Sequence, residues 1–228
     1  TGRLAISAQP WLADHTVGGT AFFPGTGFVE LAVVAGHLVE CTRIDELTLA
    51  APLVLPAEGE IQIQVTVSGP TEDGLRAVEI FARLGAGEGW MRHASGRVGP
   101  VSTAPDAGDL AIWPPLDASP ISVDGLYEAM AAAGQGLGPA FQGLDAVFRR
   151  GDDVFAEVTL PSENTGSTGM FGLHPAVLDA ALQAIWVANP EDAAQGPRMP
   201  FVWSDVSLYA AGATALRAGC VVTARRGA

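Results

Sequence analysis

The stretch Gly27-Phe28-Val29-Glu30-Leu31-Ala32-Val33-Val34-Ala35-Gly36-His37-Leu38-Val39 decides the fold of the first half of the chain. Its apolar residues recur at the three- and four-residue spacing of an α-helix and form one wide face: Phe28, Leu31, Ala32, Ala35 and Val39. An apolar face of that width needs a sheet to pack against. The sequence therefore predicts one buried helix partly enclosed by strands.

Three strands are predicted after this helix. Residues 61–68 alternate apolar and polar side chains, as a strand with one covered face does. Residues 77–84 and 91–98 are expected to pair with it in antiparallel order, because turn residues stand at 72–74 and 85–89. We therefore interpret residues 1–98 as one unit made of a helix and an antiparallel sheet.

The segment 99–120 differs in composition from its surroundings. It is rich in Pro, Ala, Asp and Gly and has little hydrophobic periodicity, which is typical of a linker. We place the domain boundary in this segment.

Residues 121–228 repeat the layout of the first unit. A short helix is predicted to end near Ala133, with Ser122 or Asp124 as its cap, and a second helix runs from His174-Pro175 to about Val187. Strands are expected at 141–150, 153–160, 202–209 and 215–224. The second unit has fewer strands than the first, so we expect the chain to be truncated at this end or to lack loops. The pattern predicts the α+β class with two similar halves.

Composition excludes several classes of protein. Hydrophobic residues make up 48% and charged residues 16%, which indicates a packed globular chain. The net charge is −13 and Lys/Arg runs are no longer than pairs, so a nucleic-acid partner is not expected. No apolar run reaches the roughly 18 residues of a membrane span, and we expect a cytoplasmic protein without membrane contact. The chain begins in a strand-like segment without Met, which suggests a piece of a longer protein.

A histidine and a glycine-rich loop precede the first helix, in His15-Thr16-Val17-Gly18-Gly19-Thr20-Ala21-Phe22-Phe23-Pro24-Gly25. Such a loop can leave backbone N–H groups free at a helix N-terminus, where they stabilise developing negative charge. An imidazole beside that site suits proton abstraction next to a thioester carbonyl. Taken alone, His15 could equally be a structural or exposed histidine.

An acid lies in the second apolar helix, in His174-Pro175-Ala176-Val177-Leu178-Asp179-Ala180-Ala181-Leu182-Gln183. Burial would raise the pKa of Asp179 and allow it to donate a proton, and Gln183, four residues later on the same face, could hold it in place. The alternative is an acid that only interacts with the helix dipole. We also expect His174 to help shape the start of this helix.

Two other kinds of site, a dinucleotide-binding loop and a metal site, are not supported by the sequence. Residues 134–139 resemble a dinucleotide-binding fingerprint, but the sixth position is Pro139 and no βαβ unit surrounds it. His37, His93 and His174 form no metal set with each other. Cys41 and Cys220 have no metal-type companions and are expected to be structural thiols, so no metal site is predicted.

Together, these segments resemble the dehydratase domains of modular type I polyketide synthases. His15-x3-Gly19-x4-Pro24 matches their HxxxGxxxxP motif, and Asp179-x3-Gln183 matches DxxxQ/H. Two further segments fit in order: Gly138-Pro139-x-Phe141-Gln142 resembles YGPxFQ, and Met199-Pro200-Phe201-Val202-Trp203 resembles LPFxW. The resemblance runs over nearly the whole chain. It departs at Leu137, which stands where these enzymes usually have Tyr, and the missing hydroxyl leaves efficiency or exact outcome open.

The resemblance implies a double hot-dog fold, with each sheet wrapped round one long helix. It implies dehydration of a β-hydroxyacyl chain to an α,β-unsaturated thioester, as a lyase step of antibiotic-type biosynthesis. His15 would be the general base and Asp179 the general acid, and the substrate-binding or supporting residues would be Gly19, Pro24, Gly25, Leu137, Gly138, Pro139 and Gln183. The domain would need no cofactor of its own, since the substrate is carried on the phosphopantetheine of an acyl carrier protein. The carrier protein and neighbouring synthase domains would be its partners, and a homodimer is expected in the parent synthase.

Two alternatives stay open, and a third is disfavoured. A variant of the family could shift the double bond or close an ether (pyran) ring after dehydration. The chain could instead be a catalytically silent structural domain of the megasynthase. A hot-dog thioesterase is disfavoured, because that chemistry usually employs a carboxylate and water without a His and an Asp in separate halves.

Overall fold

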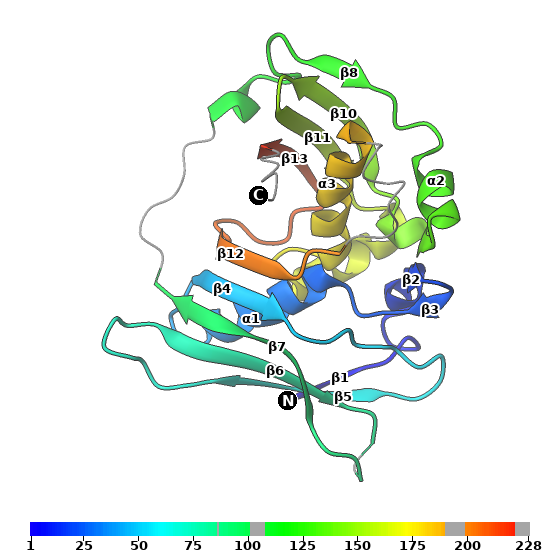
Figure 1. The fold of residues 1–228 in the computed structure, drawn as a ribbon. Helices are drawn as coiled ribbons and strands as arrows, with labels where there is room; N and C mark the ends of the chain where they lie inside the picture. The colour runs from blue at the N-terminus through cyan, green and yellow to red at the C-terminus, as the bar shows by residue number, and fades with distance from the viewer. Residues whose placement is uncertain (86, 101–107, 190–198, 222–228) are drawn as a thin grey trace, which may run out of the picture.

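The structure is a computed structural model, and it describes residues 1–85, 87–100, 108–189 and 199–221. Two helices lie near the middle of the molecule, each against the inner face of its own sheet (Figure 1). They are α1, Gly25–His37, and α3, Pro175–Ala188, and they contact each other. The predicted α+β class and both long helices are confirmed. In the part of the chain that the structure describes, no helix combines the length and the apolar character that crossing a membrane requires.

The first sheet has six strands in the order β1-β5-β6-β7-β4-β12, and all neighbours are antiparallel. Their bounds are β1 Gly2–Leu4, β4 Arg43–Leu49, β5 Ile61–Val67, β6 Arg76–Arg83, β7 Met91–Gly99 and β12 Val202–Ser207. Alternation sets its inner face: Ile61 and Ile63 of β5 are buried, as are Val78 and Ile80 of β6. The strands predicted at 61–68, 77–84 and 91–98 are therefore confirmed.

The second sheet has four strands in the order β13-β11-β10-β8 and packs on α3. Their bounds are β8 Ser119–Ile121, β10 Leu144–Arg150, β11 Asp153–Thr159 and β13 Ala215–Val221. β10 and β11 form the predicted hairpin, although β10 begins three residues later than expected. It does so because Pro139–Phe141 forms a 3₁₀ turn, η3, instead of extended chain. Residues 222–224, predicted at the end of the last strand, lie outside the described residues.

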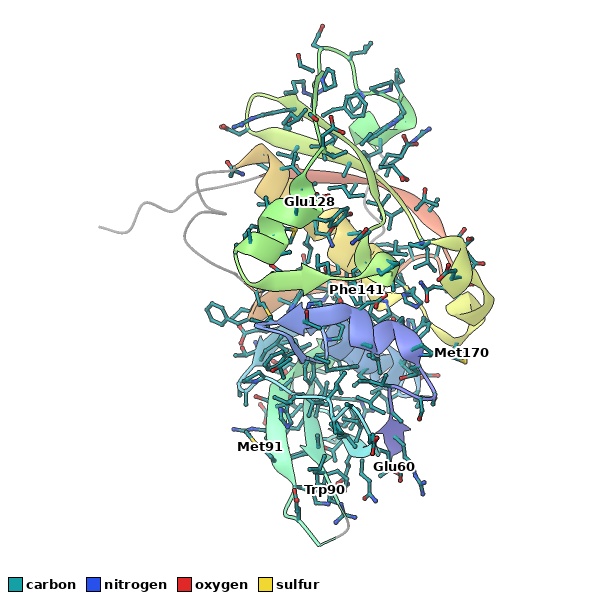
Figure 2. All side chains as sticks on the ribbon, turned by 90° about the vertical axis from the view of Figure 1, so that its right-hand side faces the viewer. Glu60, Trp90, Met91, Glu128, Phe141 and Met170 are labelled. Atoms are coloured by element: carbon teal, nitrogen blue, oxygen red, sulfur yellow. The ribbon has the colours of Figure 1, made fainter. Side chains whose placement is uncertain are left out.

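A small third sheet joins the two halves. Its order is β3-β2-β9, with β2 at His15–Val17, β3 at Thr20–Ala21 and β9 at Gln135–Leu137. β2 and β9 come from different halves and pair directly. Phe141, which follows β9, has no exposed surface and lies between the first and the second half (Figure 2). The buried side chains of both halves consequently form one continuous core.

Two sequence interpretations are wrong. The strand near residue 202, expected in the sheet of the second half, is β12, which pairs with β4 of the first sheet, with Trp203 opposite Leu47. The short helix α2, Leu126–Ala132, is capped by neither Ser122 nor Asp124, because those two side chains hydrogen-bond to each other at 2.8 Å. Its N-cap is Gly125, in a left-handed conformation with φ 72°.

The segment 99–120, predicted as a linker, is not uniform. Gly99 ends β7, residues 108–111 form a 3₁₀ turn, and Ser119 already belongs to β8. Residues 101–107 lie outside the described part. The division into 1–98 and 121–228 stays a prediction. Two strands of the second half, β9 and β12, pair with strands of the first half, β2 and β4, so each sheet they join contains strands from both halves.

Candidate active site

His15 begins β2 and is 2% exposed. Its Nδ1 lies 3.1 Å from the carbonyl oxygen of Phe22. A carbonyl only accepts hydrogen bonds, so Nδ1 carries the proton and donates it. In the neutral ring, the free lone pair then lies on the other nitrogen, Nε2. This hydrogen bond gives His15 the tautomer that a general base requires.

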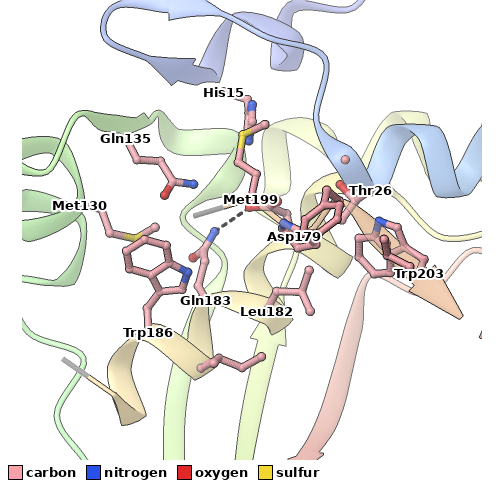
Figure 3. A pocket seen from close by; sticks show the side chains of 15 residues that line it. His15, Thr26, Met130, Gln135, Asp179, Leu182, Gln183, Trp186, Met199 and Trp203 are labelled. Atoms are coloured by element: carbon pink, nitrogen blue, oxygen red, sulfur yellow. Dashed lines mark hydrogen bonds between the residues drawn. The ribbon is translucent and has the colours of Figure 1, made fainter. Parts of the chain in front are cut away.

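Asp179 lies in the second turn of α3 and is partly exposed. Gln183 donates from Nε2 to Asp179 Oδ2 at 3.2 Å and to the carbonyl of Phe141 at 3.0 Å (Figure 3). The one amide thus fixes the carboxyl to the segment that follows β9. The ring of Phe141 also lies 5.1 Å from the ring of His15, so the same segment contacts both candidates.

Burial raises the pKa of Asp179. The nearby positive charge of His15 and the hydrogen bond from Gln183 act in the opposite direction, but burial is the larger influence. A raised pKa favours the protonated carboxylic acid, which is the form that donates a proton. The hydrogen bond to Phe22 thus gives His15 the tautomer of a base, and burial favours the protonated, acid form of Asp179.

A cavity of about 390 Å³ brings the two candidates together (Figure 3). His15, Asp179 and Gln183 line it, and apolar side chains form most of the remaining wall: Met130, Leu182, Ile185, Trp186, Met199, Phe201, Val202 and Trp203. An apolar chamber with a few polar groups is typical of a small-molecule site. The cavity can hold a flexible apolar chain beside one base and one acid.

The first turn of α1 adds backbone donors at the cavity wall. Gly25 and Thr26 line the cavity, and α1 has no side-chain cap after Pro24. Within the described residues, the backbone N–H groups of Gly25 and Thr26 make no hydrogen bond. At the positive end of the helix dipole, such groups suit a carbonyl oxygen that acquires negative charge.

His174 caps α3 and thereby sets the position of Asp179. Its Nδ1 accepts a hydrogen bond from the backbone N–H of Ala176 at 3.2 Å, so this histidine holds the opposite tautomer from His15. The ring is 1% exposed and lies edge-on to Trp11 and Phe171. Burial lowers its pKa from 6.5 to about 4. The expected role of His174 at the helix start is confirmed.

Two carboxylates of the first half hold backbone of the second half. Asp14 Oδ2 accepts from the N–H of Ala140 at 2.9 Å, and Asp14 also accepts through its carbonyl from Gly138 at 2.7 Å. A Cβ at position 138 would lie 2.4 Å from Asp14 Oδ1, so only Gly permits this approach. Glu30 of α1 binds the segment before α3 in a similar way, through the N–H groups of residues 172 and 173.

The remaining predicted residues do not all line the cavity. Gly25 and Gln183 line the cavity, and Pro24 is the N-cap of α1. Gly138 and Pro139 do not line it and instead shape η3. Leu137, 6% exposed, lies directly opposite His15 in the β2–β9 ladder.

Gly19 is not brought to the cavity. It is exposed in the turn between β2 and β3, where Gly18 and Gly19 have φ values of 57° and 79°. That backbone matches the turn of a tight β-hairpin. The N–H groups expected to polarise the carbonyl were those around Gly19 and Gly25, and of these two glycines Gly25 lines the cavity and Gly19 does not.

Sequence reasoning missed Thr26, Gln135, Asp14 and Glu30. Asp14 and Glu30 had a possible signal, since an acid beside a candidate base and an acid in an apolar helix both need a partner. Among the described residues, no group of His, Cys, Asp or Glu could hold a metal ion. The thiols of Cys41 and Cys220 are free, and Cys41 is buried.

Comparison with known proteins identifies similar families and folds. Residues 1–83 match the family model described as polyketide synthase dehydratase domain. Residues 105–227 match the one described as polyketide synthase dehydratase N-terminal domain. The two matches together cover most of the chain.

Relatives are found among large synthases. The chain is 53% identical over 221 residues to mycoketide-CoA synthase of Mycobacterium tuberculosis, covering 96% of the chain and 5% of that relative. It is 48% identical over 223 residues to the pikromycin polyketide synthase component PikAII of Streptomyces venezuelae, covering 95% and 6% respectively. The chain thus spans a small part of the relatives it matches.

Solved structures share the fold. A structure concerned with dehydratase substrate selection for the borrelidin and fluvirucin polyketide synthases has a TM-score of 0.92 at 47% identity, covering 97% of this chain and 78% of that one. The dehydratase domain from the terminal module of the rifamycin polyketide synthase gives 0.91 at 42%, covering 98% and 80%. A bifunctional dehydratase-cyclase domain in ambruticin biosynthesis gives 0.90 at 40%, covering 99% and 79%. These similarities confirm the predicted double hot-dog fold.

Proposed function

Because the chain belongs to the polyketide synthase dehydratase family, we propose that it removes water from a β-hydroxyacyl thioester during polyketide chain elongation. The observation that carries the proposal is the convergence of two groups on one apolar cavity: His15, whose Nδ1 is fixed by the carbonyl of Phe22, and Asp179, whose pKa is raised by burial. The product is an α,β-unsaturated thioester and one water.

His15 begins the reaction as the base. Its Nε2 takes the proton from the α-carbon, and the electron pair of that C–H bond moves toward the thioester carbonyl. The N–H groups of Gly25 and Thr26 stabilise the negative charge that develops on the carbonyl oxygen. The hydrogen bond from Nδ1 to Phe22 keeps the ring in place while it becomes positive.

Asp179 completes the reaction as the acid. The electron pair returns to form the double bond between the α- and β-carbons, the β-carbon–oxygen bond breaks, and Asp179 protonates the leaving hydroxyl. His15 then carries a proton and Asp179 has lost one. Transfer of a proton from His15 to Asp179, directly or through solvent, restores the starting state.

The substrate would arrive on the phosphopantetheine arm of an acyl carrier protein, and every proton transfer above uses a side chain of this domain, without a cofactor. The chain spans a small part of its relatives, which are large synthases. This supports neighbouring synthase domains as partners. We place the domain in the cytoplasm, as part of a homodimeric synthase.

One observation favours a second candidate function. The similarity to a bifunctional dehydratase-cyclase domain at 40% identity makes ring closure after dehydration a specific alternative. Ring closure adds an internal hydroxyl to the new double bond without changing mass. NMR of the product distinguishes the two, because only simple dehydration leaves the alkene protons.

The experiment follows the mass of the product formed by the purified domain. With both β-hydroxy epimers of a short acyl thioester, we expect a loss of 18 Da (one water) with one epimer and none with His15→Ala. His37→Ala is the matched control, because His37 is an exposed histidine at the end of α1. Undiminished turnover by His15→Ala at retained folding would overturn the proposal.

A further inference from the structure

Gln135 is a polar side chain in the cavity that the proposed reaction does not use. It is 6% exposed and begins β9, opposite Val17 of β2. Side chains two residues apart on a strand point to the same face, so Gln135 and Leu137 share a face and Leu137 is opposite His15. Gln135 therefore lies on the same face as the base, two residue pairs farther along the ladder.

The amide of Gln135 lacks a partner among the described residues. Its Oε1 is buried without a hydrogen bond, and its Nε2 makes none to any described group. Leaving a buried acceptor unpaired costs about 1–3 kcal/mol. An acceptor needs a donor, so the matching ligand group carries an O–H or N–H.

The position of Gln135 in the cavity says which part of a substrate it meets. In Figure 3, Gln135, Met130 and Trp186 lie on one side of Asp179, and Thr26 and Trp203 lie on the other. In the proposed reaction, the thioester carbonyl lies at the Thr26 side, where the free N–H groups of α1 are. The acyl chain beyond the β-carbon consequently extends past Asp179 toward Met130, Trp186 and Gln135.

We propose that Gln135 is a specificity-determining residue that selects acyl chains carrying a second hydroxyl beyond the β-carbon. The hydroxyl donates to Oε1 of Gln135 and accepts from its Nε2, on a side of the cavity that Met130, Trp186 and Gln183 also line. This inference rests on the proposed dehydration and names the class of its substrate, an oxygenated acyl chain.

The test compares thioesters that differ in one hydroxyl. The probes are N-acetylcysteamine thioesters of 3-hydroxyoctanoate, 3,5-dihydroxyoctanoate and 3,7-dihydroxyoctanoate, and the readout is kcat/KM for water loss. We expect one dihydroxy substrate to be preferred about tenfold over the monohydroxy one, as a hydrogen bond of about 1.4 kcal/mol gives. In Gln135→Met, which keeps the volume and removes the amide, this ratio falls to near one.

Met130→Leu is the matched control. It changes another cavity residue on the same side without adding or removing a hydrogen-bonding group, so the ratio is expected to persist. Equal ratios in the wild type and Gln135→Met would overturn the inference. A wild type that dehydrates none of the three would instead overturn the proposed function, so the two failures are distinguishable.

Discussion

Glu30, in the middle of α1, accepts a 2.6 Å hydrogen bond from the backbone N–H of Gly172, two residues before the cap of α3. Its second oxygen accepts from the next N–H, of Leu173, at 3.1 Å. Glu30 is 8% exposed, so both bonds are sheltered from water. The central helix of the first half thus fixes where the acid-bearing helix of the second half begins.

Replacing Glu30 by Gln is expected to lower the free energy of unfolding by about 1–3 kcal/mol. The amide keeps one acceptor but turns an NH₂ group toward a backbone N–H, which leaves one buried donor unpaired. Urea denaturation followed by circular dichroism measures the change. Glu46→Gln is the control, because Glu46 is exposed in β4, and equal effects of the two changes would contradict a bridging role.

The approach of Asp14 to Gly138 predicts a measurable coupling. A Cβ at 138 would meet Asp14 Oδ1 at 2.4 Å and its Cβ at 2.8 Å, so Gly138→Ala forces the carboxylate off the N–H of Ala140. We expect this change to cost about 1–3 kcal/mol alone and clearly less in an Asp14→Gly background. A double-mutant cycle on unfolding free energies measures the difference. Strict additivity would show that the two positions do not contact each other in solution.

The sequence predicted both central helices because each carries its own periodic apolar face, and α1 and α3 are found within two residues of the predicted bounds. It also predicted His15, Asp179 and Gln183 as a set, through motif spacing. It could not predict that β12 joins the first sheet or that β2 pairs with β9, since pairing across more than 100 residues leaves no local pattern.

The site residues that were missed have the same explanation. Gln135 is an ordinary polar residue in the sequence and becomes notable only because β9 places it in an apolar cavity. Asp14 and Glu30 required partners that lie more than 120 positions away, at Ala140 and Gly172. Gly19 shows the converse, since a motif glycine expected at the carbonyl serves the hairpin turn instead.

The lowered pKa of His174 leads us to expect a loss of stability at acid pH. Its folded-state pKa is depressed from 6.5 to about 4, so between these values the unfolded chain binds a proton that the folded chain does not. The free energy of unfolding therefore falls as pH drops from about 6.5 toward 4. His174→Asn keeps a capping side chain but removes the titrating group, and part of this pH dependence should vanish.

The same variant has a separate effect at neutral pH. Loss of the ring contacts with Trp11 and Phe171 is expected to lower the free energy of unfolding by about 1–3 kcal/mol. Denaturation curves at pH 7, 5.5 and 4.5 separate this constant loss from the pH-dependent one. An unchanged slope between pH 6.5 and 4 in His174→Asn would show that another group causes the acid sensitivity.

The hydrogen bond from Gln183 to Asp179 leads to a prediction about the rate of water elimination at alkaline pH. Asp179 acts as an acid only while protonated, so water elimination should decline as pH rises through the pKa of Asp179. The hydrogen bond from Gln183 holds that pKa lower than burial alone would set it. Gln183→Met removes the bond, and the alkaline limb of kcat should move to higher pH, with a lower maximum because the carbonyl of Phe141 loses its donor.

Gln142→Met is the matched control for this shift. Gln142 also donates its amide to a backbone carbonyl of the same segment, that of Leu137 at 2.7 Å, but makes no bond to Asp179 in the described structure. Its variant should weaken the segment and leave the alkaline limb in place. If both variants move the limb equally, distortion of the segment sets the pH dependence, and Asp179 is not the acid whose protonation the rate follows.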